Sequence, residues 1–439
     1  MDKGDRTAAK PLSVNPFQTS QIIGAVLALQ GIYRAVPILH GAQGCAESVK
    51  TVLSRHFREP ISIQNIAIHE QNLIFGGEKG IRDMIRLVVE KYNPDVLALI
   101  GTSITEVVGE DLLGTAEGYY RQHKMMFKDK LMCGLYLPDY EGSMESGYAK
   151  SVYAVIQKVI QNSGRIVRKK KRNRINLLPG AHLTPGDVME LKEMIASFDI
   201  EVIVLPDLSS SLTGHLMTGH TPLSRGGVPL DYLREMLTST YTLALGGSME
   251  ACAKLLKEEL QIPYQVFQGV TGLRETDEFF LFLRQFSQSD GQNKYRWQRQ
   301  FLLDCMLDTR SVFRGKRIIA ALEPDHLIAL YQCLAELGIK SVGSVIPAGS
   351  PAVAAMPEAV QTGDLEDLER MAAGGADLWV SNAYGERHAL KSGIPFLPLG
   401  FPVFNRFGAP ANISVGYRGT ADLLNNIANT MNSKGRNRR

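Results

Sequence analysis

Cys45 is the residue of this sequence with the clearest potential for chemistry. It ends the segment HGAQGC (residues 40–45), which we expect to leave a short strand and to open a helix. Glycines such as Gly44 let backbone amides approach a ligand, and the start of a helix favours a thiolate over a thiol. A thiolate placed there could act as a nucleophile or as a ligand for a soft metal. The alternative is a small buried hydrophobic residue.

The other four cysteines are expected to be packing residues. Cys133 lies in a predicted strand, and Cys252, Cys305 and Cys333 lie in predicted helices among apolar neighbours. None of the five forms a CxxC or comparable spacing, which argues against a four-cysteine zinc or iron–sulfur site within this one chain. If Cys45 binds a cluster, the remaining ligands must come from another subunit.

Histidines near this cysteine are a second group of candidates. His40, His56 and His69 lie in the same region, and only His40 is close to Cys45 in sequence. For each of them, a histidine satisfied by hydrogen bonds in a loop or helix is the default interpretation.

Acidic residues follow the strand predicted to end at Ile100. A position at the carboxyl end of a parallel strand favours a functional site. Acidic residues are also common in the first turn of a helix because of its dipole. The sequence leaves both interpretations open for Glu106, Glu110 and Asp111.

Common catalytic and nucleotide-binding motifs are missing. The sequence contains no GxGxxG after a strand, no GxxxxGK[ST], no HExxH and no GxSxG. Nucleotide-binding, zinc-hydrolase and serine-hydrolase interpretations therefore have no support.

Strand-like and helix-like segments alternate along the whole chain, which predicts an α/β fold with parallel sheets. We expect three Rossmann-like domains, each a mostly parallel sheet flanked by helices. The expected strands are 35–39, 96–100, 131–137, 175–178, 201–205, 317–322, 341–346 and 377–380, with a further segment at 394–396. The expected helices are 21–29, 45–55, 79–92, 187–197, 249–260, 275–287, 297–309, 325–337 and 365–373.

A run of seven basic residues, RIVRKKKRNR, suggests the first boundary. A solvated linker is the favoured interpretation, and a docking patch is the alternative. The predicted division is an N-terminal domain carrying Cys45 (1–164), a basic linker (165–174), a middle domain (175–312) and a C-terminal domain (313–439) with a frayed basic tail from 433. A long loop at 209–227 is expected to be functional or to face a partner.

The chain has 439 residues, which at about 150 residues per domain agrees with three domains. It is 44% hydrophobic and 21% charged, as expected for a globular protein with a large core and not for a disordered chain or coiled coil. The net charge of +3 gives no electrostatic case for nucleic acid or membrane binding. The polar N-terminus lacks the apolar core of a signal peptide, and the odd number of five cysteines fits a reducing compartment. We therefore expect a cytoplasmic protein.

Several segments together resemble the nitrogenase component 1 family. They are NPFQTSQIIGAVLALQGI (15–32), VPILHGAQGC (36–45), RHFREPI (55–61), FGG (75–77), TEVVGED (105–111), PDYEGS (138–143), SNAYG (381–385), GFPVFNRFGA (400–409) and VGYRGT (415–420). The resemblance spans nearly the whole chain in the family's order, and it implies the three-domain fold of that family.

Within that family, the catalytic β chain contributes three cysteines to an eight-iron P-cluster. Only the first of these positions is a cysteine here, as Cys45, whereas the other two are Ile63 and Ser103. A serine of the β chain is also replaced, by Asp139. The resemblance therefore implies that a P-cluster cannot form on this chain.

A single cysteine in the HGxQG loop is similar to the scaffold branch of the family, which assembles the iron–molybdenum cofactor without turnover of its own. The resemblance implies that Cys45 is a metal ligand, that Gly44 contacts the cofactor, and that no residue is catalytic. The implied cofactors are a [4Fe-4S] cluster at a subunit interface and an iron–molybdenum cofactor precursor held mainly by the partner subunit.

The implied partners are a NifE-like subunit in an α2β2 heterotetramer, the nitrogenase iron protein as a transient partner, a donor of the cofactor precursor, and nitrogenase component 1 as acceptor. The alternative is an electron-relay subunit of a related reductase, either the nitrogenase β chain or the B subunit of dark-operative protochlorophyllide reductase.

Overall fold

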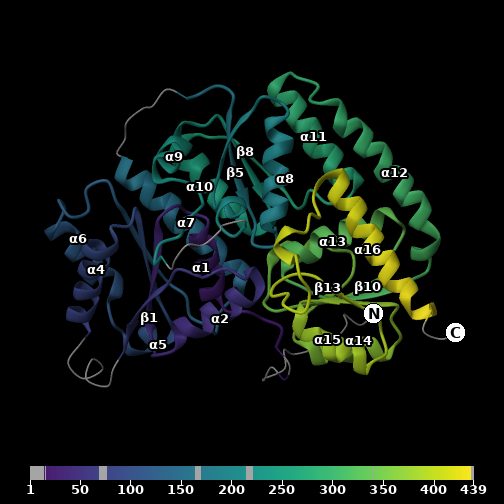
Figure 1. The fold of residues 1–439 in the computed structure, drawn as a ribbon, viewed down its shortest axis with the longest axis horizontal. Coiled ribbons are helices and arrows are strands. Elements are labelled where there is room, and N and C mark those ends of the chain that lie inside the picture. The colour runs from purple at the N-terminus through teal and green to yellow at the C-terminus, as the bar shows by residue number, and fades with distance from the viewer. Residues whose placement is uncertain are drawn as a thin grey trace, which may run out of the picture.

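The structure is a computed structural model that describes residues 14, 16–68, 77–163, 170–213, 221–339 and 341–436. Within these residues the chain forms three parallel sheets, each flanked by helices, as the alternating sequence pattern predicts. Figure 1 shows the three units in an arc, with the N-terminal unit at lower left, the middle unit at the top and the C-terminal unit at lower right.

The N-terminal unit is built on a four-stranded sheet with the order β2-β1-β3-β4. Its strands are β1 (Ala35–Gly41), β2 (Gln64–Ala67), β3 (Val96–Gly101) and β4 (Leu131–Tyr136). Its helices are α1 (Gln21–Gln30), α2 (Cys45–Phe57), α4 (Glu78–Tyr92), α5 (Ser103–Val108), α6 (Leu112–Gln122) and α7 (Met144–Ser163).

The middle unit has a four-stranded sheet with the order β6-β5-β7-β8. Its strands are β5 (Arg174–Pro179), β6 (Glu201–Val204), β7 (Tyr241–Leu245) and β8 (Tyr264–Phe267). Its helices are α8 (Pro185–Ala196), α9 (Leu230–Glu235), α10 (Glu250–Leu260), α11 (Leu273–Ser287) and α12 (Asn293–Phe313).

The C-terminal unit has a five-stranded sheet with the order β11-β10-β9-β12-β13. Its strands are β9 (Arg317–Ala321), β10 (Ser341–Ile346), β11 (Val360–Thr362), β12 (Leu378–Ser381) and β13 (Phe396–Pro398). Its helices are α13 (Pro324–Glu336), α14 (Leu365–Ala373), α15 (Glu386–Lys391) and α16 (Gly416–Arg436). Short 3₁₀ turns occur at Leu208–Ser210, Met236–Thr238, Gly247–Met249, Pro351–Ala355, Ala383–Gly385 and Ala409–Ala411.

The hydrophobic cores extend across the boundaries between units. One core joins α1 and α7 of the N-terminal unit to α10 of the middle unit, and a second joins the middle and C-terminal units. Helix α1 is buried along its whole length. It crosses α7 closely at Gly24 and Gly147, where an added Cβ would lie about 2 Å from a backbone oxygen of the facing helix. The arc is therefore held together by shared apolar packing.

Most expected elements are present with small shifts at their ends. The elements not expected from the sequence are β2, β7, β8, β11, α5, α6, α7, α9, α15 and α16. The C-terminal tail is also different from the expectation, because α16 continues to Arg436 where fraying was expected from 433. The outer part of the 209–227 loop, residues 214–220, lies outside the described residues.

The predicted basic linker needs a correction at its end. Residues 164–169 lie outside the described part of the chain, but Arg174 is the first residue of β5 and is 4% exposed. Its guanidinium pairs with Glu201 and Glu235, each at 2.7 Å. A run of charge by itself indicates a solvated linker, whereas two acidic partners allow Arg174 to be buried in a strand.

Candidate functional site

Cys45 lies where the connections from the first sheet diverge. The chain leaves β1 through α2 and returns to β2 on one side of β1, whereas β3 pairs with its other side. In open parallel sheets, ligands bind outside the carboxyl ends of strands at such a switch point. Cys45 is the first residue of α2, four residues after β1 ends. The sequence prediction of a strand, a glycine-containing loop and a helix at this cysteine is confirmed.

The loop before Cys45 leaves its backbone accessible. Gly44 has φ 98°, a left-handed conformation that favours glycine, and a Cβ placed there would meet nothing within 4 Å. Gln43 and Gly44 are exposed, whereas Cys45 is half-buried against the apolar core. The backbone N–H of Cys45 donates to the oxygen of Ala42 at 3.2 Å. A large group can therefore approach this helix start from outside.

The other four thiols are poor candidates for metal binding. Cys133, Cys252, Cys305 and Cys333 are all buried, as expected from the sequence. Burial raises the pKa of Cys133 and of Cys252 to about 12, and it also raises the pKa of Cys305 and Cys333. These groups therefore stay protonated at neutral pH, and Cys45 is the cysteine that solvent or a partner can reach.

His40 is a buried structural residue of β1 and not a loop histidine. Its Nε2 lies 2.6 Å from Oε2 of Glu110, and its Nδ1 lies 3.2 Å from the backbone oxygen of Ile66. Its own backbone oxygen accepts hydrogen bonds from the hydroxyls of Thr102 and Thr105. His40 thus connects β1 to β2, to the start of α5 and to Glu110.

The acidic residues after β3 have different partners. Glu110 is bound to His40, and Asp111 caps α6 by accepting the N–H of Gly114 at 2.8 Å. Glu106 is exposed and accepts the hydroxyl hydrogen bond of Tyr140 at 2.7 Å, which raises the pKa of that tyrosine. The helix-start interpretation therefore describes Glu106, which lies in the first turn of α5, and Asp111, which is the N-cap of α6, whereas Glu110 is engaged by His40.

His56 and His69 do not join Cys45 in a recognisable cluster. His56 is buried near the end of α2, where its Nδ1 accepts the N–H of Val403 at 2.9 Å, and burial lowers its pKa to about 4. His69 lies outside the described residues. Across the described part of the chain, no group of three or more His, Cys, Asp or Glu side chains is arranged to hold a metal ion.

Ile63 and Ser103, the two positions where the resemblance implies a cysteine in the β chain, have other contacts here. Ile63 is 4% exposed and belongs to the same core that Cys45 contacts. Ser103 begins α5, and its Oγ accepts the backbone N–H of Asp139 at 2.8 Å. Residues 103 and 139 therefore meet at the carboxyl ends of β3 and β4, and β3 is the neighbour of β1 in the sheet.

Exposed apolar side chains occur beside these strand ends. We define the α5 strip as Ile104, Val107 and Val108 of α5 together with Tyr140, which follows β4. Val107 is 82% exposed and Tyr140 66% exposed. Exposed apolar patches of this kind mark contact surfaces for other chains.

Residues 20–432, nearly all of the described chain, match the family model of nitrogenase component 1 type oxidoreductases. The chain belongs to the nitrogenase component 1 family. The NifN nitrogenase iron-molybdenum cofactor biosynthesis proteins of Rippkaea orientalis (strain PCC 8801 / RF-1) and of a Nostoc sp. strain are 36% and 35% identical to it. Both matches cover 96% of this chain, and they cover 94% and 93% of the relatives.

Proteins named as nitrogenase are also similar to this chain. The nitrogenase molybdenum-iron protein beta chain of Clostridium pasteurianum is 31% identical over 97% of this chain and 94% of its own length. A solved structure, nitrogenase Cp1 at pH 6.5, is 29% identical with a TM-score of 0.88, and the match covers 98% of this chain and 95% of that one. The expected three-unit α/β fold of the family is confirmed. Among the described residues, no helix combines the length and the apolar character needed to cross a membrane.

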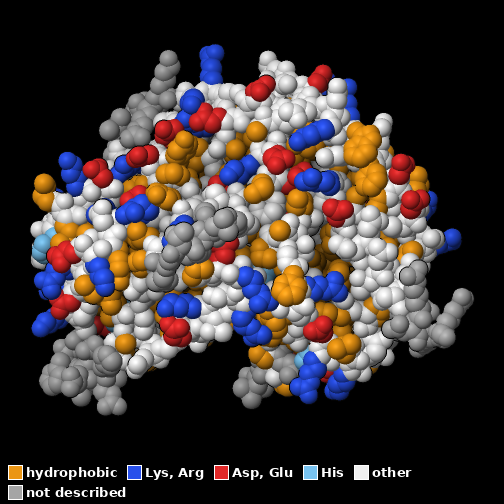
Figure 2. All heavy atoms as spheres, viewed as in Figure 1, with side chains coloured by type: hydrophobic (Ala, Val, Ile, Leu, Met, Phe, Trp, Pro, Cys, Tyr) orange, Lys and Arg blue, Asp and Glu red, His pale blue; other side chains and the backbone are white. Residues whose placement is uncertain are grey.

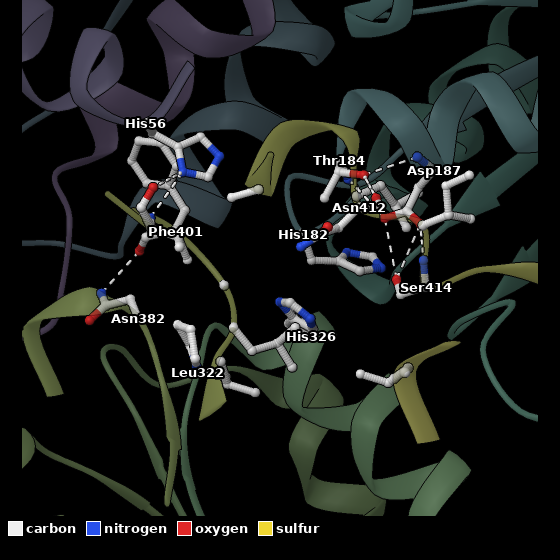
Figure 3. Close-up of a pocket in the computed structure, with 18 of the residues that line it drawn as sticks. His56, His182, Thr184, Asp187, Leu322, His326, Asn382, Phe401, Asn412 and Ser414 are labelled. Carbon is white, nitrogen blue, oxygen red and sulfur yellow. Dashed lines mark hydrogen bonds between the residues drawn. The ribbon is translucent and has the colours of Figure 1, made fainter. Parts of the chain in front are cut away.

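A central cavity is a feature of this family member that was not expected from the sequence. It has a volume of about 700 Å³ and is lined by residues of all three units. Figure 3 shows His182 and His326 next to each other in the middle of it, with His56 and Asn382 on another side. His182 follows β5 and His326 follows β9. Each of these strands comes first in chain order within its unit, as β1 does before Cys45. That shared position is the signal that could have identified both histidines.

Proposed function

We propose that this chain is a scaffold subunit on which a precursor of the nitrogenase iron–molybdenum cofactor is matured, without turnover of its own. In this proposal, the Cys45 thiolate is one ligand of a [4Fe-4S] cluster and a NifE-like partner subunit supplies the other three. The names of the relatives that match over nearly their full length support the biosynthetic role.

The observation that carries the proposal is the isolation of Cys45 at an accessible helix start. It is the half-buried cysteine of the chain, and no second thiolate is available because the other four thiols are buried with raised pKa values. A cubane cluster normally takes four protein ligands. One accessible ligand on this chain therefore calls for three from elsewhere.

The surroundings of Cys45 suit a shared site. The open space over Gly44 admits a large group, and backbone amides at the start of α2 can donate to sulfur atoms. The α5 strip offers an apolar surface for the partner beside the same strand ends. In an assembly, burial of this strip would also exclude water from the cluster.

The second candidate function is an electron-relay subunit of a catalytic reductase in the same family. The beta chain of Clostridium pasteurianum supports it with 31% identity over nearly the whole chain. Ile63 and Ser103 count against it, because an aliphatic side chain cannot bind iron and this serine already accepts a hydrogen bond from Asp139.

The experiment that tests the proposal is metal analysis of the complex formed when this chain is co-expressed with a NifE-like partner. We expect about four irons per shared interface site, together with a separable iron–sulfur precursor that can be passed to nitrogenase component 1. Eight irons at the interface site would instead establish the relay function. A complex without interface iron would refute both.

A further inference from the structure

The central cavity has the size and position of a ligand site. Its volume of about 700 Å³ lies within the range of roughly 300–1,000 Å³ that is typical of small-molecule pockets. The walls come from the end of α2, the segment after β5, the segment after β9 and the chain between β13 and α16. Cys45 is not among its lining residues, so this inference does not depend on the proposed function.

Two strands at switch points end at the cavity. β5 lies between β6 and β7, and β9 lies between β10 and β12, so the connections leave these strands toward opposite sides. His182 comes three residues after β5, and His326 comes in the first turn of α13 after β9. Both histidines therefore stand where parallel sheets bind their ligands.

The imidazole of His182 lacks hydrogen-bond partners within the described part of the chain, and the ring of His326 lies beside it. Their ring centroids are 5.9 Å apart, and both ring nitrogens of His182 are buried without a hydrogen bond. Burial lowers the pKa of His182 to about 4 and that of His326 to about 3. Each ring is thus neutral at pH 7 and offers one donor and one acceptor. Leaving the two buried nitrogens of His182 unsatisfied is energetically unfavourable, and a bound polar molecule would remove that cost.

Three arginines lie at or beside the mouth of the cavity. Arg406 lines it and is exposed, whereas Arg55 and Arg58 lie outside its lining. The guanidinium of Arg55 is 3.9 Å from the centre of the Phe404 ring, and that of Arg58 is 5.7 Å from the centre of the ring of Phe407, which lines the cavity. Arg58 donates to the backbone oxygen of Phe404 at 3.2 Å. None of these three arginines forms an ion pair within the residues that the structure describes. Figure 2 shows Lys and Arg side chains gathered in the lower middle of this face, where Figure 1 shows α2 beside the chain that leads to α16.

Most charged groups of the cavity wall are already engaged. Asp187 accepts backbone hydrogen bonds from Thr184 and Ser414. Glu323 accepts the hydroxyl of Ser143, and burial raises its pKa to about 7. Of the remaining wall charges, Arg418 is paired with Glu190, and Asp422 is an exposed carboxylate on α16. Together with Arg55 and Arg58 beside the lining, the exposed charges that the structure describes at the entrance are three arginines and one carboxylate, Asp422.

We propose that the cavity binds a small organic anion, with its carboxylate or phosphate group held by Arg406 at the mouth and its polar body hydrogen-bonded by His182 and His326. Arginine is suited to this because its guanidinium forms two parallel hydrogen bonds to a carboxylate or phosphate. The occupant is organic because the volume far exceeds an inorganic ion and much of the wall is apolar, including Phe57, Met144 and Leu322.

The test is calorimetric titration of the full-length chain with citrate, glucose 6-phosphate and inorganic phosphate in buffer of physiological ionic strength. We expect one site per chain for at least one of the two organic anions, with affinity that falls as salt is added. Arg406→Gln should weaken that binding about 10-fold, the factor that corresponds to loss of one strong interaction. Arg86→Gln, which changes an exposed arginine of α4 far from the lining residues, should leave binding unchanged.

His326→Gln tests binding inside the cavity separately from binding at its entrance. If the organic body enters the cavity, this variant should weaken binding of the organic anion and leave binding of inorganic phosphate unchanged. The proposal is overturned if neither organic anion binds at millimolar concentration, if inorganic phosphate binds as well as both, or if Arg406→Gln has no effect. Unfolding temperatures of all variants should match the wild type, which keeps misfolding separate from loss of the site.

Discussion

At the scale of single residues, the sequence predicts where a residue lies in a helix or strand better than it predicts which residues it contacts. The pattern of a strand, glycines and a cysteine predicts that Cys45 opens a helix, because glycine and helix-start preferences act over a few residues. The bond between His40 and Glu110 joins residues 70 positions apart. Nothing local to either residue encodes that bond, so only the folded sheet reveals that His40 is structural. The roles of Gly44 and Cys45 toward a cluster remain predictions.

The residue-scale prediction concerns Cys45→Ala. In the complex with the partner subunit, iron at the interface and its electron paramagnetic resonance signal should be lost, because one of four cluster ligands is removed. Folding and assembly should persist, since the side chain is half-buried at the edge of the core. Iron analysis, resonance spectra and size-exclusion chromatography check this.

Cys252→Ala is the matched control, because it removes a fully buried thiol. It should keep the iron and lower the free energy of unfolding by about 1 kcal/mol. An iron content that Cys45→Ala leaves intact would contradict the assignment of this cysteine.

At the scale of elements, local sequence signals fail where tertiary packing selects the residues. Helix α7 contains Gly147 and Ser151, which lower helix propensity, yet Gly147 is required for the close crossing with α1. Helix α16 carries several asparagines and is held by its packing on α12. By contrast, α8 was predicted from its start at Thr184-Pro185, because its capping box acts within one turn.

Gly24→Ala tests the crossing of α1 and α7. An added Cβ would lie 1.9 Å from the backbone oxygen of Met144, so the two helices must move apart. We expect the free energy of unfolding to fall by about 1–3 kcal/mol. Gly118→Ala in α6 is the control: its Cβ would meet nothing within 4 Å, and alanine should raise stability by up to about 1 kcal/mol. Denaturant titration measures both, and equal effects would contradict the role of the crossing.

Val107→Glu tests the α5 strip as the partner surface. A charge at this exposed position should leave the stability of the isolated chain within about 0.5 kcal/mol. Affinity for the partner subunit should fall about 10-fold or more if the strip is buried in the complex. Leu87→Glu, at a half-exposed apolar position of α4, is the control for added charge. Unchanged partner affinity of Val107→Glu, measured by calorimetry or co-purification, would remove the strip from the interface.

At the scale of the whole molecule, the fold class follows from the alternation of strands and helices, but the arrangement of the units does not. The order of strands and helices within each unit follows from the local sequence pattern. The contacts between units depend instead on pairs of residues that are far apart in the sequence. Glu145 of α7 accepts the backbone N–H of Asp325 at 2.9 Å, and Asp325 in turn accepts the hydroxyl of Ser248 at 2.6 Å. The sequence does not show that these residues meet, and the central cavity exists only because the units are placed in this way.

The buried carboxyl groups at this contact between units predict how stability depends on pH. Burial raises the pKa of Glu145, Glu323 and Asp325, and that of Glu323 to about 7. Between its ordinary pKa near 4.5 and about 7, the folded chain therefore holds the proton of Glu323 more tightly than the unfolded chain does. Stability contributed by the protonated group is present below this window and is lost as pH rises through it.

Glu323→Gln isolates this contribution, because glutamine stays neutral and can still accept the hydroxyl of Ser143. Relative to wild type, the variant should gain stability as pH rises from 5 to 8, by at least about 1 kcal/mol, since one pKa unit corresponds to about 1.4 kcal/mol. The lowered pKa of His56 acts in the opposite direction, because it makes both proteins less stable as pH falls from 6.5 to about 4, and it cancels in the difference. Denaturant titrations at both pH values measure that difference, and a value independent of pH would show that Glu323 is ionised in the folded chain.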